Sequence, residues 1–287
     1  TIQQQDGSTP VSVSVAPGDV APIQVAATVG EGSYMSGDVI VSTTYDGKKL
    51  ESEFPVKFIA PDVRMAFVDV SGDSIRSANT IASLGALQYR YVPMTSGEMS
   101  LFNGWNPKQF GVVVVEGNKW IITGSDKQNL SAYLDAGGRA LVTGGELAFG
   151  LADPASTSTD RDEAFLEGTL HATYVRDSAG PRTVRGVSGD AVSGDFASKQ
   201  VKIYAEDIDA PNQPDEIAPT NGAIPVYYYG TGDQVAGIRW NDDATRLVYL
   251  SFGVQNLAET DRDPIIKDAL DWLGQAQSSV QPTGVTP

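Results

Sequence analysis

Hydrophobic and polar positions in the middle of the chain follow the pattern of a strand, a helix and a second strand. The first is a continuous, mainly β-branched run at residues 111–115, which is typical of a strand buried on both faces of a parallel sheet. The helix carries Leu130, Tyr133 and Leu134 at helical spacing, and a second apolar run follows at residues 139–143. Two strands joined through a helix indicate a right-handed parallel crossover. The pattern therefore predicts an α/β domain.

Apolar segments on both sides of this central stretch extend the same domain. Helical spacing predicts helices at residues 74–84 and 263–274, the second with Pro264 in its first turn. The turn at residues 241–243 predicts an antiparallel hairpin between the last two strands. Short apolar runs predict strands at residues 64–70, 88–92, 172–175, 201–204, 223–229, 234–240 and 246–252.

Before residue 60 the pattern changes to the period of two that half-buried strands show. Asp46-Gly47 is a two-residue hairpin signal, and apolar residues alternate with others at residues 11–15, 23–29, 39–43 and 54–58. These strands are similar to the later half of immunoglobulin-like or fibronectin-like β-sandwich modules, which usually take ~100 residues when complete. The sequence thus predicts an incomplete β-sandwich segment at residues 1–60, an α/β domain at 61–275 and a linker or tail at 276–287.

Net charge limits the partners that this chain can bind. Its 287 residues carry 20 basic and 36 acidic side chains, a net charge of −16. This charge opposes binding to nucleic acid or anionic lipid, because both are bound through Lys and Arg. No apolar run approaches the ~20 residues of a membrane-spanning helix. Cysteine is absent, which excludes disulfides and thiolate chemistry. Abundant Gly, Ser and Thr with few Lys favour a secreted or cell-surface protein of a bacterium or archaeon.

Carboxylates follow several predicted strands. They are thus expected at the carboxyl ends of the strands, where parallel sheets bind ligands. Asp69 and Asp73 end the first strand, Glu116 ends the central strand, and Glu146 follows the next one. Two such groups facing each other across a pocket would suit a sugar-binding or metal-assisted hydrolytic site. A structural role instead predicts a cleft filled by side chains such as Trp105, Trp120 and Phe149.

The helix that ends at Gly137-Gly138, the strand at 139–143 and the turn Gly144-Gly145-Glu146 together resemble the class I glutamine amidotransferase-like fold, a flavodoxin-like α/β fold. The likeness covers about residues 62–274, through RMAFVDV, DKQNLSAYLDAGGRALVTGGE, AFLEGTLHATYVRD and RLVYLSFGVQNL followed by IIKDALDWLG. Enzymes of this family carry a cysteine nucleophile on the turn and a histidine after a late strand. This chain has no cysteine, and its one histidine, His171, lies elsewhere. The resemblance implies a degenerate elbow, Gly144-Gly145-Glu146, without a catalytic residue.

The resemblance also implies where in a larger protein such a module occurs. Such modules follow sandwich segments in the C-terminal regions of large secreted subtilisin-like and other extracellular proteins, as non-catalytic companions. We therefore expect a structural or accessory module, not an enzyme, that spaces or docks neighbouring domains of its precursor or assembles with other copies of itself. The alternative is a carbohydrate- or metal-dependent binding or hydrolytic domain that uses the strand-end carboxylates. No cofactor signature is present.

Four other features have competing interpretations. Glu146 is expected to cap the helix after the turn rather than to act as a catalytic carboxylate. His171 is expected at a helix end or strand edge rather than in catalysis. The acidic runs at residues 206–216 and 241–246 hold oxygen ligands suited to Ca²⁺, without EF-hand spacing. An adhesin-like binder of polysaccharide would expose aromatic side chains, for which residues 227–229, three tyrosines, are the candidates.

Overall fold

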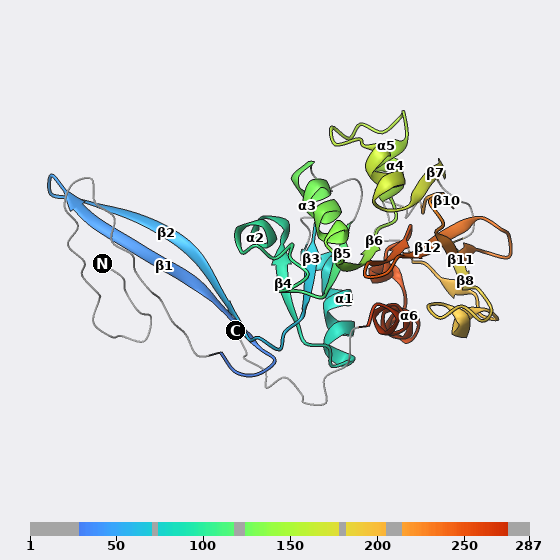
Figure 1. Cartoon of the computed structure of the whole chain (residues 1–287), viewed down its shortest axis with the longest axis horizontal. Coiled ribbons are helices and arrows are strands. Elements are labelled where there is room, and N and C mark those ends of the chain that lie inside the picture. The colour runs from blue at the N-terminus through green and yellow to red at the C-terminus, as the bar shows by residue number, and fades with distance from the viewer. Residues whose placement is uncertain (1–28, 71–73, 118–123, 178–181, 205–213, 275–287) are drawn as a thin grey trace. The chain divides into compact units, whose positions relative to one another are not determined.

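The computed structural model describes residues 29–70, 74–117, 124–177, 182–204 and 214–274 (Figure 1). The chain divides into two compact parts, Thr1–Val63 and Arg64–Pro287, which we term the N-terminal unit and the α/β unit. The strand predicted at residues 11–15, most of the one at 23–29, and the tail at 276–287 lie outside the described residues.

The described part of the N-terminal unit is a long β-hairpin. Strands β1 (Tyr34–Tyr45) and β2 (Lys48–Ile59) pair antiparallel along their whole length. Asp46 and Gly47 join them with φ values of 50° and 70°. These are the left-handed conformations of a two-residue type I′ turn, which Asp-Gly favours. The hairpin signal is thereby confirmed, although the described residues of this unit form a two-stranded sheet and not a sandwich.

The α/β unit is built on a mixed, 11-stranded sheet. Its parallel strands lie in the order β4-β3-β5-β6-β13, so the first strand along the chain lies between the second and the third. This is the order of doubly wound, flavodoxin-like sheets, and it confirms the predicted α/β fold. The parallel strands are β3 (Met65–Asp69), β4 (Tyr91–Thr95), β5 (Val112–Glu116), β6 (Arg139–Thr143) and β13 (Arg246–Leu250).

Beyond β13 the sheet continues with antiparallel strands, of which β11, β12 and β13 are joined one to the next by short hairpins rather than helical crossovers. The predicted hairpin between the last two strands is confirmed as β12 and β13. The antiparallel strands are β12 (Val235–Asn241), β11 (Ile224–Tyr229), β8 (Thr183–Gly186) and β9 (Val201–Lys202), with β10 (Glu216–Pro219) and β7 (Ala172–Arg176) branching from β12.

Helices cover both faces of the parallel strands. Right-handed crossovers from β3 to β4 and from β5 to β6 run in opposite directions along the sheet, so α1 and α3 lie on opposite faces (Figure 1). The helices are α1 (Ser74–Ala86), α2 (Ser96–Leu101), α3 (Gly124–Asp135), α4 (Leu147–Ala152), α5 (Glu163–Gly168) and α6 (Glu259–Trp272), with short 3-10 turns η1 (Gly194–Phe196) and η2 (Val254–Asn256). None of the described helices is long and apolar enough to cross a membrane.

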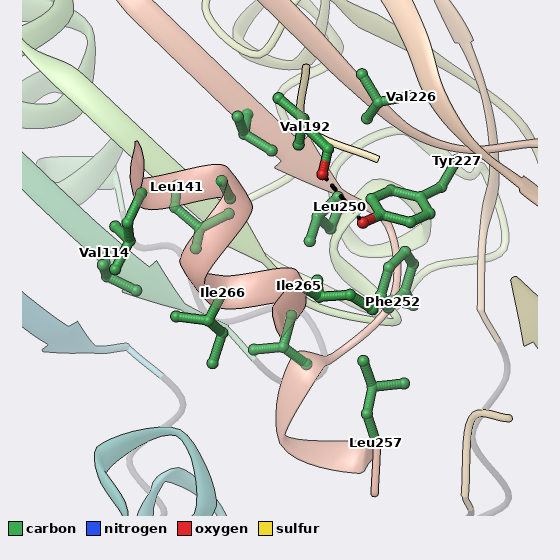
Figure 2. Close-up of a cluster of buried hydrophobic side chains, with 14 of the residues drawn as sticks. Val114, Leu141, Val192, Val226, Tyr227, Leu250, Phe252, Leu257, Ile265 and Ile266 are labelled. Carbon is green, nitrogen blue, oxygen red and sulfur yellow. Dashed lines mark hydrogen bonds between the residues drawn. The ribbon is translucent and has the colours of Figure 1, made fainter. Parts of the chain in front are cut away.

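A cluster of buried apolar side chains lies between the sheet and helix α6. Figure 2 shows Ile265 and Ile266 of α6 within the same cluster as Leu141 of β6, and all three side chains are fully buried. The cluster extends under the antiparallel strands, where the Tyr227 hydroxyl donates a hydrogen bond to the carbonyl oxygen of Val192 at 3.4 Å (Figure 2). This cluster therefore joins the parallel and antiparallel parts of the sheet.

Candidate functional site at the carboxyl ends of the parallel strands

Two of the predicted carboxylates, Asp69 and Glu116, end neighbouring strands in register. They lie where the strand order reverses, which is the switch point at which doubly wound sheets bind ligands. Paired residues of parallel strands point to the same face, so both side chains lie on the face of α1. Asp73 lies outside the described residues, as do residues 118–123 after β5. The structure therefore brings together two of the four predicted carboxylates here.

Glu116 is an interior group. Its side chain is 1% exposed, and its Oε2 atom accepts a hydrogen bond from the hydroxyl of Thr80 on α1. A buried carboxylate requires such partners, because its removal from water is otherwise costly. Glu116 therefore helps to hold helix α1 against strand β5.

The residues directly after these strands continue the backbone hydrogen bonding of the sheet. Each hydrogen bond runs from the residue after one strand to the neighbouring strand: Val70 to Glu116 at 3.0 Å, Gly117 to Thr143 at 2.9 Å and Gly144 to Leu250 at 3.2 Å. A Cβ atom at Gly144 would lie 2.7 Å from the carbonyl oxygen of Gly117, so only glycine permits this approach. Position 144 therefore cannot carry a nucleophilic side chain without displacing the backbone.

The turn Gly144-Gly145-Glu146, predicted as a degenerate elbow, has an ordinary backbone conformation. None of these three described residues has a positive φ, and Glu146 has φ −113° and ψ 13°. A nucleophile elbow is a sharp and strained strand-to-helix turn. The turn between β6 and α4 connects the two elements without that strain.

A residue from elsewhere in the chain caps α4. Glu146 stands at the N-cap position, but its side chain makes no capping hydrogen bond, so the prediction that it caps the helix is wrong. The cap is Asp215, whose Oδ2 atom accepts a hydrogen bond from the Phe149 amide at 2.8 Å. The Asp215 amide in turn donates to the carbonyl oxygen of Gly145 at 3.1 Å. Sequence reasoning missed Asp215 except as part of an acidic run, because its partners are distant in the sequence.

Asp215 is completely buried. Its carbonyl oxygen accepts hydrogen bonds from the hydroxyls of Tyr229 at 3.1 Å and Ser251 at 2.8 Å, whereas its Oδ1 atom has no hydrogen-bond partner in the described part of the chain. Burial raises the pKa of this carboxyl well above its usual range; the Phe149 amide lowers the pKa and the charge of Glu146 raises it. The structure therefore places Glu146 beside Asp215, where the charges of the two oppose each other.

His171 lies away from this turn. Its imidazole stacks on the indole of Trp240 with ring centroids 3.9 Å apart. Trp240 pairs with Leu247 near the amino end of β13, whereas the turn after β6 lies at the carboxyl ends of the parallel strands. Burial lowers the pKa of His171, and the charge of Asp242 acts in the opposite direction. His171 is therefore a neutral packing residue near neutral pH, at the start of β7.

The candidate aromatic residues of the cleft separate into two groups. Phe149 lies at the turn and packs edge to face against Tyr174, with ring centroids 6.3 Å apart. Trp105 instead packs against Tyr133, whose hydroxyl donates to the carbonyl oxygen of Phe110 just before β5. Trp105 thus lies near the amino ends of the parallel strands, away from the turn. Trp120 lies outside the described residues.

The three tyrosines at residues 227–229 are not an exposed surface. Tyr227 and Tyr229 are fully buried, and Tyr228, on the other face of the strand, is partly covered by the Arg185 guanidinium, 5.1 Å from the ring centroid. Two of the three candidate aromatic side chains are therefore part of the core and the third is partly covered, so residues 227–229 do not form an exposed aromatic surface.

Asp215, Glu216 and Asp242, three of the described carboxylates in the two acidic runs, have structural partners. Asp242 accepts hydrogen bonds from the amides of Ala244 at 3.1 Å and Thr245 at 2.9 Å in the turn before β13, and Glu216 pairs with Arg176 at 2.7 Å. Within the described residues, no group of three or more His, Cys, Asp or Glu side chains is placed to hold a metal ion.

Comparison with known proteins gives limited guidance. No protein-family model and no curated protein match the sequence. Among solved structures, an exo-β-1,4-mannosidase from Opitutaceae bacterium strain TAV5 is similar with a TM-score of 0.45 and 10% identity, over 74% of this chain and 35% of that one. The chain thus spans about a third of that enzyme's length, and no functional argument follows from so distant a likeness.

Proposed function

We propose that the α/β unit is a non-catalytic, amidotransferase-like module that serves a structural or accessory role in a secreted or cell-surface protein. It would space or dock neighbouring domains or assemble with other copies of the chain. The observation that carries this proposal is the hydrogen bond from the Phe149 amide to Asp215. The chain's own carboxyl occupies the Phe149 amide in the first turn of α4, the helix that follows the turn on which the enzymes of the resembled family carry their nucleophile.

The chemistry of such a turn explains why this observation matters. Backbone amides at a helix start stabilise negative charge that develops on a substrate. Here a fully buried carboxyl already uses the amide of Phe149, and the close approach of Gly144 to Gly117 leaves no room for a nucleophilic side chain at position 144. Amides and nucleophile are both needed for acyl transfer, so these two features support a loss of the family's chemistry.

One observation favours the alternative function. Asp69 and Glu116 end adjacent strands in register at the switch point, and paired carboxylates can act on sugars or hold divalent cations. A binding or hydrolytic site there would use Asp69, which is partly exposed, more directly than the buried Glu116. This second candidate predicts a ligand that the accessory role does not require.

A ligand titration of the full chain separates the two. Melting temperature would be followed with Ca²⁺ and with neutral oligosaccharides, for the native chain, for Asp69→Asn and for Asp38→Asn on the hairpin as a control. A ligand at 100 times its Kd stabilises a protein by about 2.7 kcal/mol, which is easily detected. We expect no shift in any of the three proteins. A ligand-dependent rise that Asp69→Asn abolishes and Asp38→Asn keeps would overturn the accessory assignment in favour of a ligand-binding site at Asp69.

A further inference from the structure

The β1–β2 hairpin has two chemically different faces. Directly paired residues share a face, and successive residues alternate between faces. The register therefore places on one side, which we term the apolar face, Met35, Val39, Val41, Leu50, Phe54 and Phe58. The opposite side carries the charged residues Asp38, Lys49, Glu51, Glu53 and Lys57 together with Tyr34, Ile40 and Ile59, and Lys48 lies at the turn end of the apolar face. The hairpin is thus an amphipathic two-stranded sheet, and its apolar face is suited to burial.

The apolar face is not covered in the described structure. Met35 is 43% exposed, Val41 36%, and Leu50 and Phe54 each 53%, and all four lie on this one face. A two-stranded hairpin is at best marginally stable alone in water. An apolar surface of this kind marks a contact with another part of the chain or with a partner.

A second copy of the hairpin would form too small an interface with the apolar face. Each strand has 12 residues, so at ~3.4 Å per residue and ~5 Å per strand the face measures on the order of 400 Å². Two hairpins face to face would bury roughly 800 Å², below the ~1,200 Å² of the smallest stable interfaces. A segment of the same chain loses no translational freedom on docking, which removes a cost that a second molecule has to meet.

The chain supplies such a segment immediately before the hairpin. Valines alternate with serines at residues 11–15, and apolar residues alternate again at 23–29. Between residues 8 and 29 the only charged residue is Asp19. A sequence with an apolar side and almost no charge matches the apolar face, which is likewise uncharged from Met35 to Thr43 and along their partners.

The turn that precedes β1 lies at the base of the hairpin. The Ser33 amide donates to the carbonyl oxygen of Gly30 at 3.2 Å, as in a β-turn, which reverses chain direction. This turn is fixed to the end of β2, since the Ala60 amide donates to Ser33 at 3.1 Å and the Gly32 amide donates to Asp62 at 3.1 Å. Residues before Gly30 therefore start from the base of the hairpin.

We propose that the apolar face of the hairpin is the docking surface for residues 9–29 of the same chain. The two together would form a complete layered β-module, with the valines of the segment packed against Phe54 and its neighbours. This proposal does not depend on the role assigned to the α/β unit.

The absence of cysteine allows a direct test in the full chain. Phe54→Cys would be combined in turn with Val11→Cys, Val13→Cys and Val15→Cys, and the same three would be combined with Glu53→Cys on the opposite face as matched controls. A disulfide forms only when the Cβ atoms come within about 4.5 Å. We expect at least one Phe54 pair to give an intramolecular disulfide ten times faster than its Glu53 control. Disulfide-linked dimers would assign the face to a second copy, and equal rates on both faces would assign it to some other occupant; either result overturns the proposal.

Hydrogen exchange on the unaltered chain tests the same proposal without any substitution, so its result does not depend on whether the cysteine variants fold. Docked residues 11–15 and 23–28 should exchange at least a hundred times more slowly than an unstructured peptide. Exchange at the unstructured rate in both stretches would overturn the proposal, whatever the disulfides show.

Discussion

The Oδ2 atom of Asp215 accepts a hydrogen bond at 2.8 Å from the amide of Phe149, which lies 66 residues earlier in the chain. The bond ties the start of β10 to the first turn of α4. Backbone amides at a helix start have no partner within the helix, and a buried one requires a partner from elsewhere. Asp215 therefore completes the turn after β6 as a structural element.

Replacement of Asp215 by Ala should destabilise the α/β unit by roughly 2–3 kcal/mol, because it removes a cap and leaves the Phe149 amide without its partner. Denaturation by urea measures the loss, and hydrogen exchange should place it in α4. Asp243→Ala, at an exposed position in the turn before β13, is the matched control and should change little. Unchanged protection of α4 in Asp215→Ala would show that the cap is dispensable.

Asp215→Asn should alter how stability depends on pH. The pKa of Asp215 is raised in the folded protein, so the folded state holds this proton more tightly than the unfolded state does. The stability from the neutral carboxyl is therefore complete below the unfolded pKa of about 3.9 and is lost as pH rises toward the folded pKa. Asparagine cannot ionise and can still accept the amide hydrogen bond. The free energy of unfolding of the variant, relative to the native chain, should increase from pH 4 to pH 8, and a constant difference would contradict the raised pKa.

The sequence was informative where a signal is local. Residues 111–115 and 139–143 were identified as buried strands because a strand covered on both faces is apolar throughout, and Asp46-Gly47 because its turn requires left-handed residues. Asp215 could not be identified, since its role comes from a contact with a helix far away in the sequence. The tyrosines at 227–229 were misjudged because their burial depends on the strands beside β11, which the local pattern does not reveal.

His171→Asn should change stability with pH in the opposite direction to Asp215→Asn. His171 has φ 54°, a conformation that asparagine tolerates, so the variant removes the stacking on Trp240 without adding backbone strain. The pKa of His171 is lowered by burial, so its stability is complete above the unfolded value of about 6.5 and is lost as pH falls. The native chain should be more stable by about 1–2 kcal/mol at pH 8, and its advantage should shrink toward pH 5. Urea denaturation of both proteins at these pH values provides the test, and an advantage that grows on acidification would mean that His171 is charged in the fold.

Gly144→Ala tests whether the close approach of the strand ends is required. The added Cβ would lie 2.7 Å from the carbonyl oxygen of Gly117, which is backbone and is itself fixed by the hydrogen bond from the Gly117 amide to Thr143. Relief of the overlap has to separate β5 from β6 at their carboxyl ends, at a cost of roughly 1–3 kcal/mol. Gly168→Ala is the matched control, because a Cβ there meets nothing within 4 Å and alanine favours the helix by up to ~1 kcal/mol. Melting temperature should therefore fall by several degrees for Gly144→Ala and stay level or rise for Gly168→Ala. Equal behaviour of the two variants would mean that the turn after β6 can open, and that the space for a side chain at position 144 exists after all.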